Sequence, residues 1–163
     1  MDISAYSALL FLPLALPICV YVTFSDMRDM RIPNQMVTAL FLVFAVVGLF
    51  ALPLDVYAWR YVHLIVVLVA GIALNAGGVM GAGDAKFAAA AAPFIHLGDV
   101  QFLLALFAAN LLAAFAAHRI GKYTGLKNIA PHWKSWTSPK FPMGLALGGT
   151  LALYLGLGVW LGK

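Results

Sequence analysis

The chain has 163 residues, of which 64% are hydrophobic and only 10% are charged, and its formal net charge is +4. A mean hydropathy of +0.96 excludes a water-soluble globular protein of this size, because too little polar surface is left to face water. The apolar runs are too long for barrel strands and lack their alternation. The sequence therefore predicts an all-α, polytopic membrane protein with one integral-membrane domain over residues 1–163.

Six apolar runs separated by charged or turn residues predict about six transmembrane helices in one bundle. The runs cover residues 4–24, 35–52, 61–78, 85–97, 100–117 and 142–161. The fourth run is short, since its 13 residues would cover about 20 Å of a hydrocarbon core about 30 Å thick. We therefore expect Asp84, which precedes this run, to be recessed in the membrane.

The basic residues predict the orientation of the chain. With the N-terminus outside, the connections after the first, third and fifth runs lie in the cytoplasm, where basic residues are enriched. Those connections, taken as residues 25–34, 79–86 and 118–141, hold eight of the ten Lys and Arg residues: Arg28, Arg31, Lys86, Arg119, Lys122, Lys127, Lys134 and Lys140. Only Arg60 and Lys163 are left outside. We expect the basic, aromatic segment 118–141 to lie on lipid headgroups and to bind no nucleic acid.

Two aspartates at the predicted cytoplasmic ends of the first and fourth helices are candidate functional residues. Asp26 ends the first apolar run, and Asp84 lies in the glycine-rich break Gly81-Ala82-Gly83-Asp84. An ionisable group next to lipid is by default a candidate for function. Amide hydrolysis without a metal or a Ser or Cys nucleophile needs one carboxylate to take a proton from water and one carboxyl to donate a proton. The two aspartates therefore predict acid/base chemistry at one site.

These residues resemble the motifs of a known family. The stretch Gly81-Ala82-Gly83-Asp84 matches the GxGD signature of intramembrane aspartyl proteases, and Lys86 completes the GxGDxK form typical of type IV prepilin peptidases. Asp26, followed after a short basic stretch by Ile32-Pro33-Asn34, resembles the first aspartate motif of that family. The resemblance implies Asp26 and Asp84 as the catalytic pair and requires no cofactor and no metal. It implies supporting or substrate-binding roles for the remaining motif residues: Gly81, Gly83, Lys86, Pro33 and Asn34.

The resemblance also implies a substrate and a location. Such a peptidase lies in the inner (plasma) membrane and cleaves, at the cytoplasmic face, the leader of prepilin or pseudopilin precursors that have a hydrophobic N-terminal helix. Larger members carry paired cysteines that bind zinc, and they also methylate the new N-terminus. This chain has only Cys19, so we expect no methyltransferase activity. It is most similar to the short peptidases of tight-adherence (Flp-type) pilus systems.

Several alternatives remain open at this point. Archaeal preflagellin peptidases share the GxGD motif, and a non-enzymatic ion or proton pathway or a scaffold would also account for paired membrane carboxylates. Asp29 competes with Asp26 for the first catalytic position, and a metal between the aspartates is a further alternative. The sequence does not decide whether the chain forms homo-oligomers. Asp55 and Asp99 are expected to be solvated in outer loops.

Overall fold

A computed structural model describes all 163 residues, with the side chain of Leu126 left out of the description. It contains the predicted six α-helices: α1 (Ala5–Asp29), α2 (Asn34–Ala51), α3 (Leu54–Ala76), α4 (Ala82–Ala91), α5 (Val100–Tyr123) and α6 (Met143–Leu161). Four short 3₁₀ turns lie between them: η1 (Ala92–Phe94), η2 (Leu97–Asp99), η3 (Gly125–Asn128) and η4 (Lys134–Trp136). The all-α prediction is confirmed.

Five segments are long and apolar enough to cross a membrane, so this is a multi-pass membrane protein. They are α1, α2, α3, η2 with α5, and α6. Helix α4 differs, because its 10 residues rise only about 15 Å. It starts at Ala82, earlier than the apolar run predicts. It ends at Ala91, because Pro93, the second residue of η1, has no backbone N–H to continue the helix. Helix α4 is therefore a short helix with Asp84 in its first turn.

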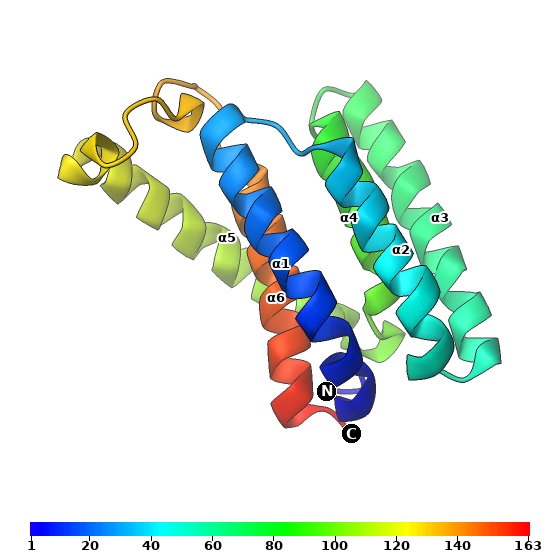
Figure 1. Ribbon diagram of the computed structural model, residues 1–163. Coiled ribbons are helices and arrows are strands. Elements are labelled where there is room, and N and C mark those ends of the chain that lie inside the picture. Colours follow the sequence, from blue (N-terminus) through cyan, green and yellow to red (C-terminus); the bar gives the residue numbers. More distant parts are fainter.

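The helices run alternately in opposite directions, as predicted for a protein that crosses the membrane repeatedly (Figure 1). Both chain termini lie at one end of the bundle, which we call the termini end, and the opposite end, where α1 ends and α4 begins, is called the aspartate end. The termini are joined directly, since the amide of Ala5 donates to the carbonyl of Lys163 (2.9 Å) and the amide of Lys163 donates to the carbonyl of Ile3 (3.1 Å).

Helices α1 and α6 lie side by side along their length (Figure 1). Glycine allows this approach: a Cβ atom on Gly148 would lie 2.8 Å from the carbonyl oxygen of Cys19, and one on Gly158 would lie 3.0 Å from the Cβ atom of Ala8. Near the aspartate end the hydroxyl of Thr23 donates to the carbonyl of Gly144 (3.3 Å). This packing places the end of α1 against the beginning of α6.

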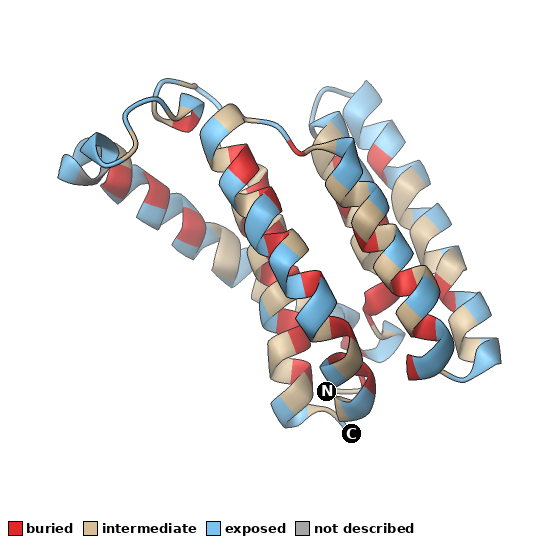
Figure 2. Ribbon diagram, in the orientation of Figure 1, coloured by how far each residue is buried: buried red, intermediate tan, exposed pale blue. Residues whose placement is uncertain are grey.

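The core is aromatic and lies between α1, α2 and η1. Phe11 contacts Phe94 edge to face, with ring centroids 4.9 Å apart, and Phe44 packs on both rings. Figure 2 shows buried residues on the inner faces of the helices and exposed residues on their outer faces. Many exposed side chains are large and apolar, Val46 and Ile72 among them. Such an outer surface is expected where lipid, and not water, surrounds the protein.

Candidate active site

Asp26 lies in the last turns of α1 and is buried. Its Oδ2 atom accepts a hydrogen bond from the backbone amide of Gly144, at 2.6 Å. Gly144 is the second residue of α6, and the first amides of a helix have no partner within the helix. The Asp26 carboxylate therefore satisfies one of these amides and lies at the positive end of the α6 dipole.

Gly144 is a residue of this site that the sequence analysis missed. A Cβ atom at this position would lie 2.8 Å from the Cβ atom of Asp26 and 3.0 Å from its Oδ2 atom. Only a glycine allows the start of α6 to come this close to the carboxylate without displacing it. The only sequence signal is the position of Gly144 just after Pro142, where the last apolar run begins. That signal predicts that a helix begins here, but it does not predict that the Gly144 amide binds Asp26.

Asp84 is the third residue of α4, whose N-cap is Gly81. Its carboxylate turns back toward the N-cap, where the amide of Gly81 hydrogen-bonds to it. This is one half of the capping-box arrangement, in which an acidic side chain in the first turn binds the N-cap amide. A Cβ atom on Gly81 would lie 2.6 Å from the Oδ2 atom of Asp84. The first glycine of the GxGD motif therefore leaves space for the carboxylate.

The structure places Asp26 and Asp84 at the same end of the bundle, and the charge of Asp26 acts on the carboxyl group of Asp84. Burial raises the pKa of Asp84 to about 6, and the charge of Asp26 acts in the same direction. Two neighbouring carboxyl groups tend to share one proton, since both cannot easily be charged together. At pH values near the pKa of Asp84 the pair can therefore present one carboxylate and one carboxylic acid, which is the arrangement that acid/base hydrolysis requires.

The two sequence motifs also contact each other. A Cβ atom on Gly83 would lie 3.3 Å from the Cβ atom of Ile32, so the first turn of α4 packs closely on the loop between α1 and α2. The Nζ atom of Lys86 donates to the Oδ1 atom of Asn34 at 3.2 Å. Pro33 is the N-cap of α2 and fixes the backbone where this loop ends. These contacts hold the start of α4 beside the start of α2.

Asp29, the alternative to Asp26, has other partners. It is the last residue of α1, and its side chain is 40% exposed. It forms ion pairs with the Nε atom of Arg28 (3.2 Å) and the Nζ atom of Lys134 (3.8 Å). Asp29 therefore faces the connection between α5 and α6, whereas the charge of Asp26 acts on Asp84. The geometry favours Asp26 as the partner of Asp84.

The expectation that Asp99 is solvated was wrong. Asp99 is buried at the termini end and accepts hydrogen bonds from the amides of Asp2 (2.7 Å) and Ile3 (2.9 Å) and from the hydroxyl of Tyr154 (2.8 Å). The N-terminal segment supplies two of the three donors. The sequence does not predict this contact, because the segment and Asp99 lie far apart along the chain. Asp55 is exposed, as expected, but it lies in the first turn of α3 and not in a loop, because α3 begins at Leu54, earlier than the apolar run predicts.

A cluster of three or more His, Cys, Asp or Glu side chains able to hold a metal ion does not occur among the residues that the structure describes. Lys86 has Asn34 as its partner and forms no hydrogen bond with either candidate aspartate in the described part of the chain. The chemistry available at the aspartate end is therefore that of two carboxyl groups next to the amides of two helix N-termini.

Comparison with protein-family models matches residues 13–118, more than half of the chain, to the type IV leader peptidase family. The matched segment contains Asp26, Asp84 and the loop from Ile32 to Asn34. Comparisons with curated proteins and with solved structures gave no significant match. The family match supports a leader peptidase activity on a protein substrate. On this match the chain belongs to the type IV leader peptidase family.

Proposed function

We propose that this protein is an aspartic-type endopeptidase that removes the leader from type IV pilin-like precursors, with Asp26 and Asp84 as its catalytic pair. One observation carries this proposal: Asp26 in the last turns of α1 and Asp84 in the first turn of α4 lie at the same end of a membrane bundle, where burial and the charge of Asp26 both raise the pKa of Asp84. Family membership supports the reaction class, and the paired carboxyl groups support the aspartic mechanism.

In the proposed mechanism Asp84 holds the shared proton. Burial and the neighbouring charge of Asp26 raise its pKa to about 6, while Asp26 accepts an amide hydrogen bond from Gly144, which favours its charged form. Asp26 takes a proton from water as the water oxygen bonds to the scissile carbonyl carbon, and Asp84 protonates the carbonyl oxygen. When the C–N bond breaks, Asp26 gives its proton to the leaving nitrogen, and a hydroxyl of the intermediate returns a proton to Asp84.

The other predicted site residues position this pair. Gly81 leaves space for the Asp84 carboxylate, and Gly83 lets the first turn of α4 contact the loop after α1. Lys86 and Asn34 hold the two motifs together through one hydrogen bond, next to Pro33 at the start of α2. These five residues act through the geometry of the aspartates, and Lys86 and Asn34, both exposed, are also available to the substrate.

The charge distribution supports a cytoplasmic active site in the inner (plasma) membrane. The eight basic residues of the three predicted inner connections belong to the aspartate end, whereas only Arg60 and Lys163 belong to the other end. By the positive-inside rule the aspartate end faces the cytoplasm and the N-terminus lies outside. The substrate is then a prepilin or pseudopilin whose hydrophobic N-terminal helix enters the bilayer and brings the scissile bond to this face.

Methylation of the new N-terminus is not part of the proposed function. In the larger relatives that activity accompanies a zinc-binding segment with paired cysteines, as the resemblance implies. Here Cys19 is the single cysteine, and it is buried in α1. We therefore expect a cleaved product with an unmodified N-terminus.

The test is co-expression with several candidate pilin precursors, followed by precursor size and by mass spectrometry of the mature N-terminus. We expect cleavage by the wild type and by Asp29→Asn, and loss of cleavage by Asp26→Asn and by Asp84→Asn. All variants should accumulate in the membrane to the same level. Full cleavage by either of the last two variants would refute the pair, and failure of the wild type on every precursor would favour a transport or scaffold role.

A further inference from the structure

Arg60 is a buried cation for which the described residues provide no ion-pair partner. It lies in the first turns of α3, at the termini end, and its residue is only 4% exposed. Its Nη1 atom has no hydrogen-bond partner, and no carboxylate of the described residues lies within 4.0 Å of the guanidinium. Asp99 acts on it only at longer range and already accepts three hydrogen bonds. A buried charge of this kind is strongly unfavourable unless an anion accompanies it.

Arg60 lines a pocket of about 430 Å³ at the surface of the bundle. His63, one helical turn further along α3, lines the same pocket. Its buried Nε2 atom forms no hydrogen bond of good geometry among the described residues, although the backbone of Ile95 and Ala92 lies near the imidazole. His96 and the exposed carboxylate-bearing residue Asp55 line the pocket as well. This pocket thus contains two buried nitrogen atoms that lack partners, and its chemistry fits a group with several acceptor oxygens.

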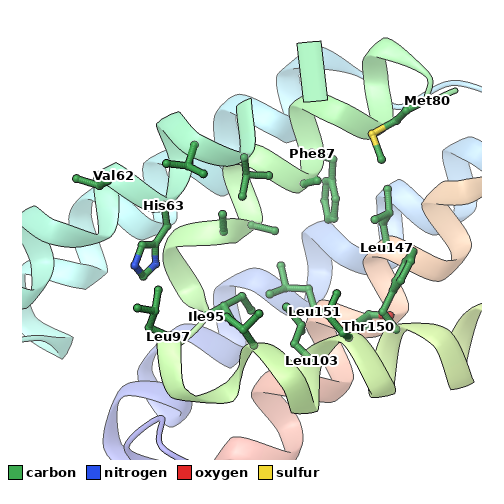
Figure 3. A pocket seen from close by; sticks show the side chains of 18 of the residues that line it. Val62, His63, Met80, Phe87, Ile95, Leu97, Leu103, Leu147, Thr150 and Leu151 are labelled. Carbon is green, nitrogen blue, oxygen red and sulfur yellow. The ribbon is translucent and has the colours of Figure 1, made fainter. Parts of the chain in front are cut away.

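An apolar groove of about 590 Å³ continues from this pocket along α3, α4, α5 and α6. The groove and the pocket share Trp59, His63 and Leu97 as lining residues, so one opens into the other. Figure 3 shows His63 and Leu97 at one end of the groove and Met80 at the other. Trp59 is 62% exposed and Leu97 is 61% exposed, so both side chains lie at the outer surface of the bundle, where membrane lipid is the surrounding medium.

We propose that a phospholipid binds here, with its phosphodiester on Arg60 and His63 and an acyl chain in the groove. A guanidinium binds phosphate through paired hydrogen bonds, which would satisfy the unpartnered atoms. Arg60 lies six residues into α3, about 9 Å along the helix, which is within reach of a headgroup at the termini end. The apolar groove distinguishes a lipid from a soluble anion, because a free phosphate would leave the groove unfilled.

The test measures thermal unfolding of the purified, delipidated protein in detergent. Phosphatidylethanolamine and phosphatidylglycerol are added separately, beside dioleoylglycerol, which lacks the phosphate, and inorganic phosphate, which lacks the chains. A ligand that binds the folded state raises the unfolding temperature. We expect a rise of several degrees with either phospholipid, little change with the other two additives, and one retained phospholipid per chain in native mass spectrometry.

Three variants make the test specific to Arg60. Arg60→Met should lose the rise, Arg60→Lys should keep part of it, and Arg119→Met, which removes an exposed arginine at the other end, should respond like the wild type. Without lipid, Arg60→Met should unfold at the same temperature as the wild type or higher, because it removes an unpaired buried charge.

Other outcomes would overturn the proposal. An equal rise with phospholipid for Arg60→Met and the wild type would show that Arg60 holds no phosphate. An equal rise with inorganic phosphate would assign the pocket to a soluble anion, and one with dioleoylglycerol would assign the groove to an apolar chain alone. A large loss of stability in lipid-free Arg60→Met would show that Arg60 has its partner within the protein.

Discussion

The carboxylate of Asp26, near the end of α1, accepts a hydrogen bond from the amide of Gly144, at the start of α6, although the two residues are 118 positions apart. This bond joins the two helices at the point where the proposed reaction takes place. The position of the carboxylate therefore depends on a glycine that belongs to neither of the two recognised motifs.

Gly144→Ala should reduce precursor cleavage by roughly 100-fold, because displacement of a catalytic group by about 1 Å has an effect of that size. The new methyl group would lie 2.8 Å from the Cβ atom of Asp26, and one of the two must move. The matched control is Gly156→Ala in the same helix, where no atom lies within 4 Å of the added Cβ atom. Equal cleavage rates for the two variants, measured with one precursor, would contradict this role.

Gly81→Ala should likewise abolish most cleavage, since its Cβ atom would lie 2.6 Å from the Oδ2 atom of Asp84. Gly77→Ala, in the same connection between α3 and α4, is the control, because its nearest contact of 3.6 Å is an ordinary one. Initial rates of cleavage at equal membrane abundance check this prediction. A Gly81→Ala variant as active as Gly77→Ala would show that the carboxylate does not need that space.

The pKa of Asp84 should fall when Asp26 is replaced by asparagine. Burial raises the pKa of Asp84 to about 6, and the negative charge of Asp26 adds to the rise, so removing that charge makes ionisation easier. Infrared titration of the protonated carboxyl band, assigned by its loss in Asp84→Asn, measures the pKa. A midpoint that is unchanged in Asp26→Asn would mean that the two groups do not interact.

The hydrogen bond between Lys86 and Asn34 predicts non-additive effects. Lys86→Met and Asn34→Ala should each lower the cleavage rate by less than about 10-fold, because an exposed hydrogen bond contributes little. The double variant should be no slower than the slower single variant, since both substitutions remove the same bond. Effects that multiply in a double-mutant cycle would show that the two residues act separately, for example each on the substrate.

At the termini end, Tyr154→Phe should lower the free energy of unfolding by about 1–3 kcal/mol, because the buried Asp99 carboxylate loses one of its three donors. The control is Tyr6→Phe, where the side chain is exposed. Thermal unfolding in detergent measures the difference. Cleavage per folded molecule should stay at the wild-type level in both variants, because Asp99 lies at the opposite end from Asp26 and Asp84.

The six helices were predictable from sequence because few backbone conformations satisfy their own hydrogen bonds in lipid. An apolar run without water must satisfy its amides and carbonyls within itself, so each run predicts a helix, and the breaks predict the connections. The motifs and helix directions also predicted that Asp26 and Asp84 lie at the same end of the bundle, as they do, while their catalytic role stays a prediction. The end of α4 at Ala91 was harder to predict from the sequence. The apolar run continues past Pro93, but proline has no backbone N–H to continue the helix.

Tertiary structure alone decided which groups meet across long stretches of the chain. Nothing near Gly144 in the sequence indicates that its amide binds Asp26, and nothing near Asp99 indicates that the N-terminal segment covers it. The sequence predicts Arg60 to be an ordinary cation on the outer side, yet the packing of the bundle buries it and leaves its Nη1 atom without a hydrogen-bond partner among the described residues. The hydrophobic pattern is a local property and determined the helices of this protein. Helix packing is not local, and it decided the hydrogen bond on the Asp26 carboxylate, the burial of Asp99 and the unpaired Arg60.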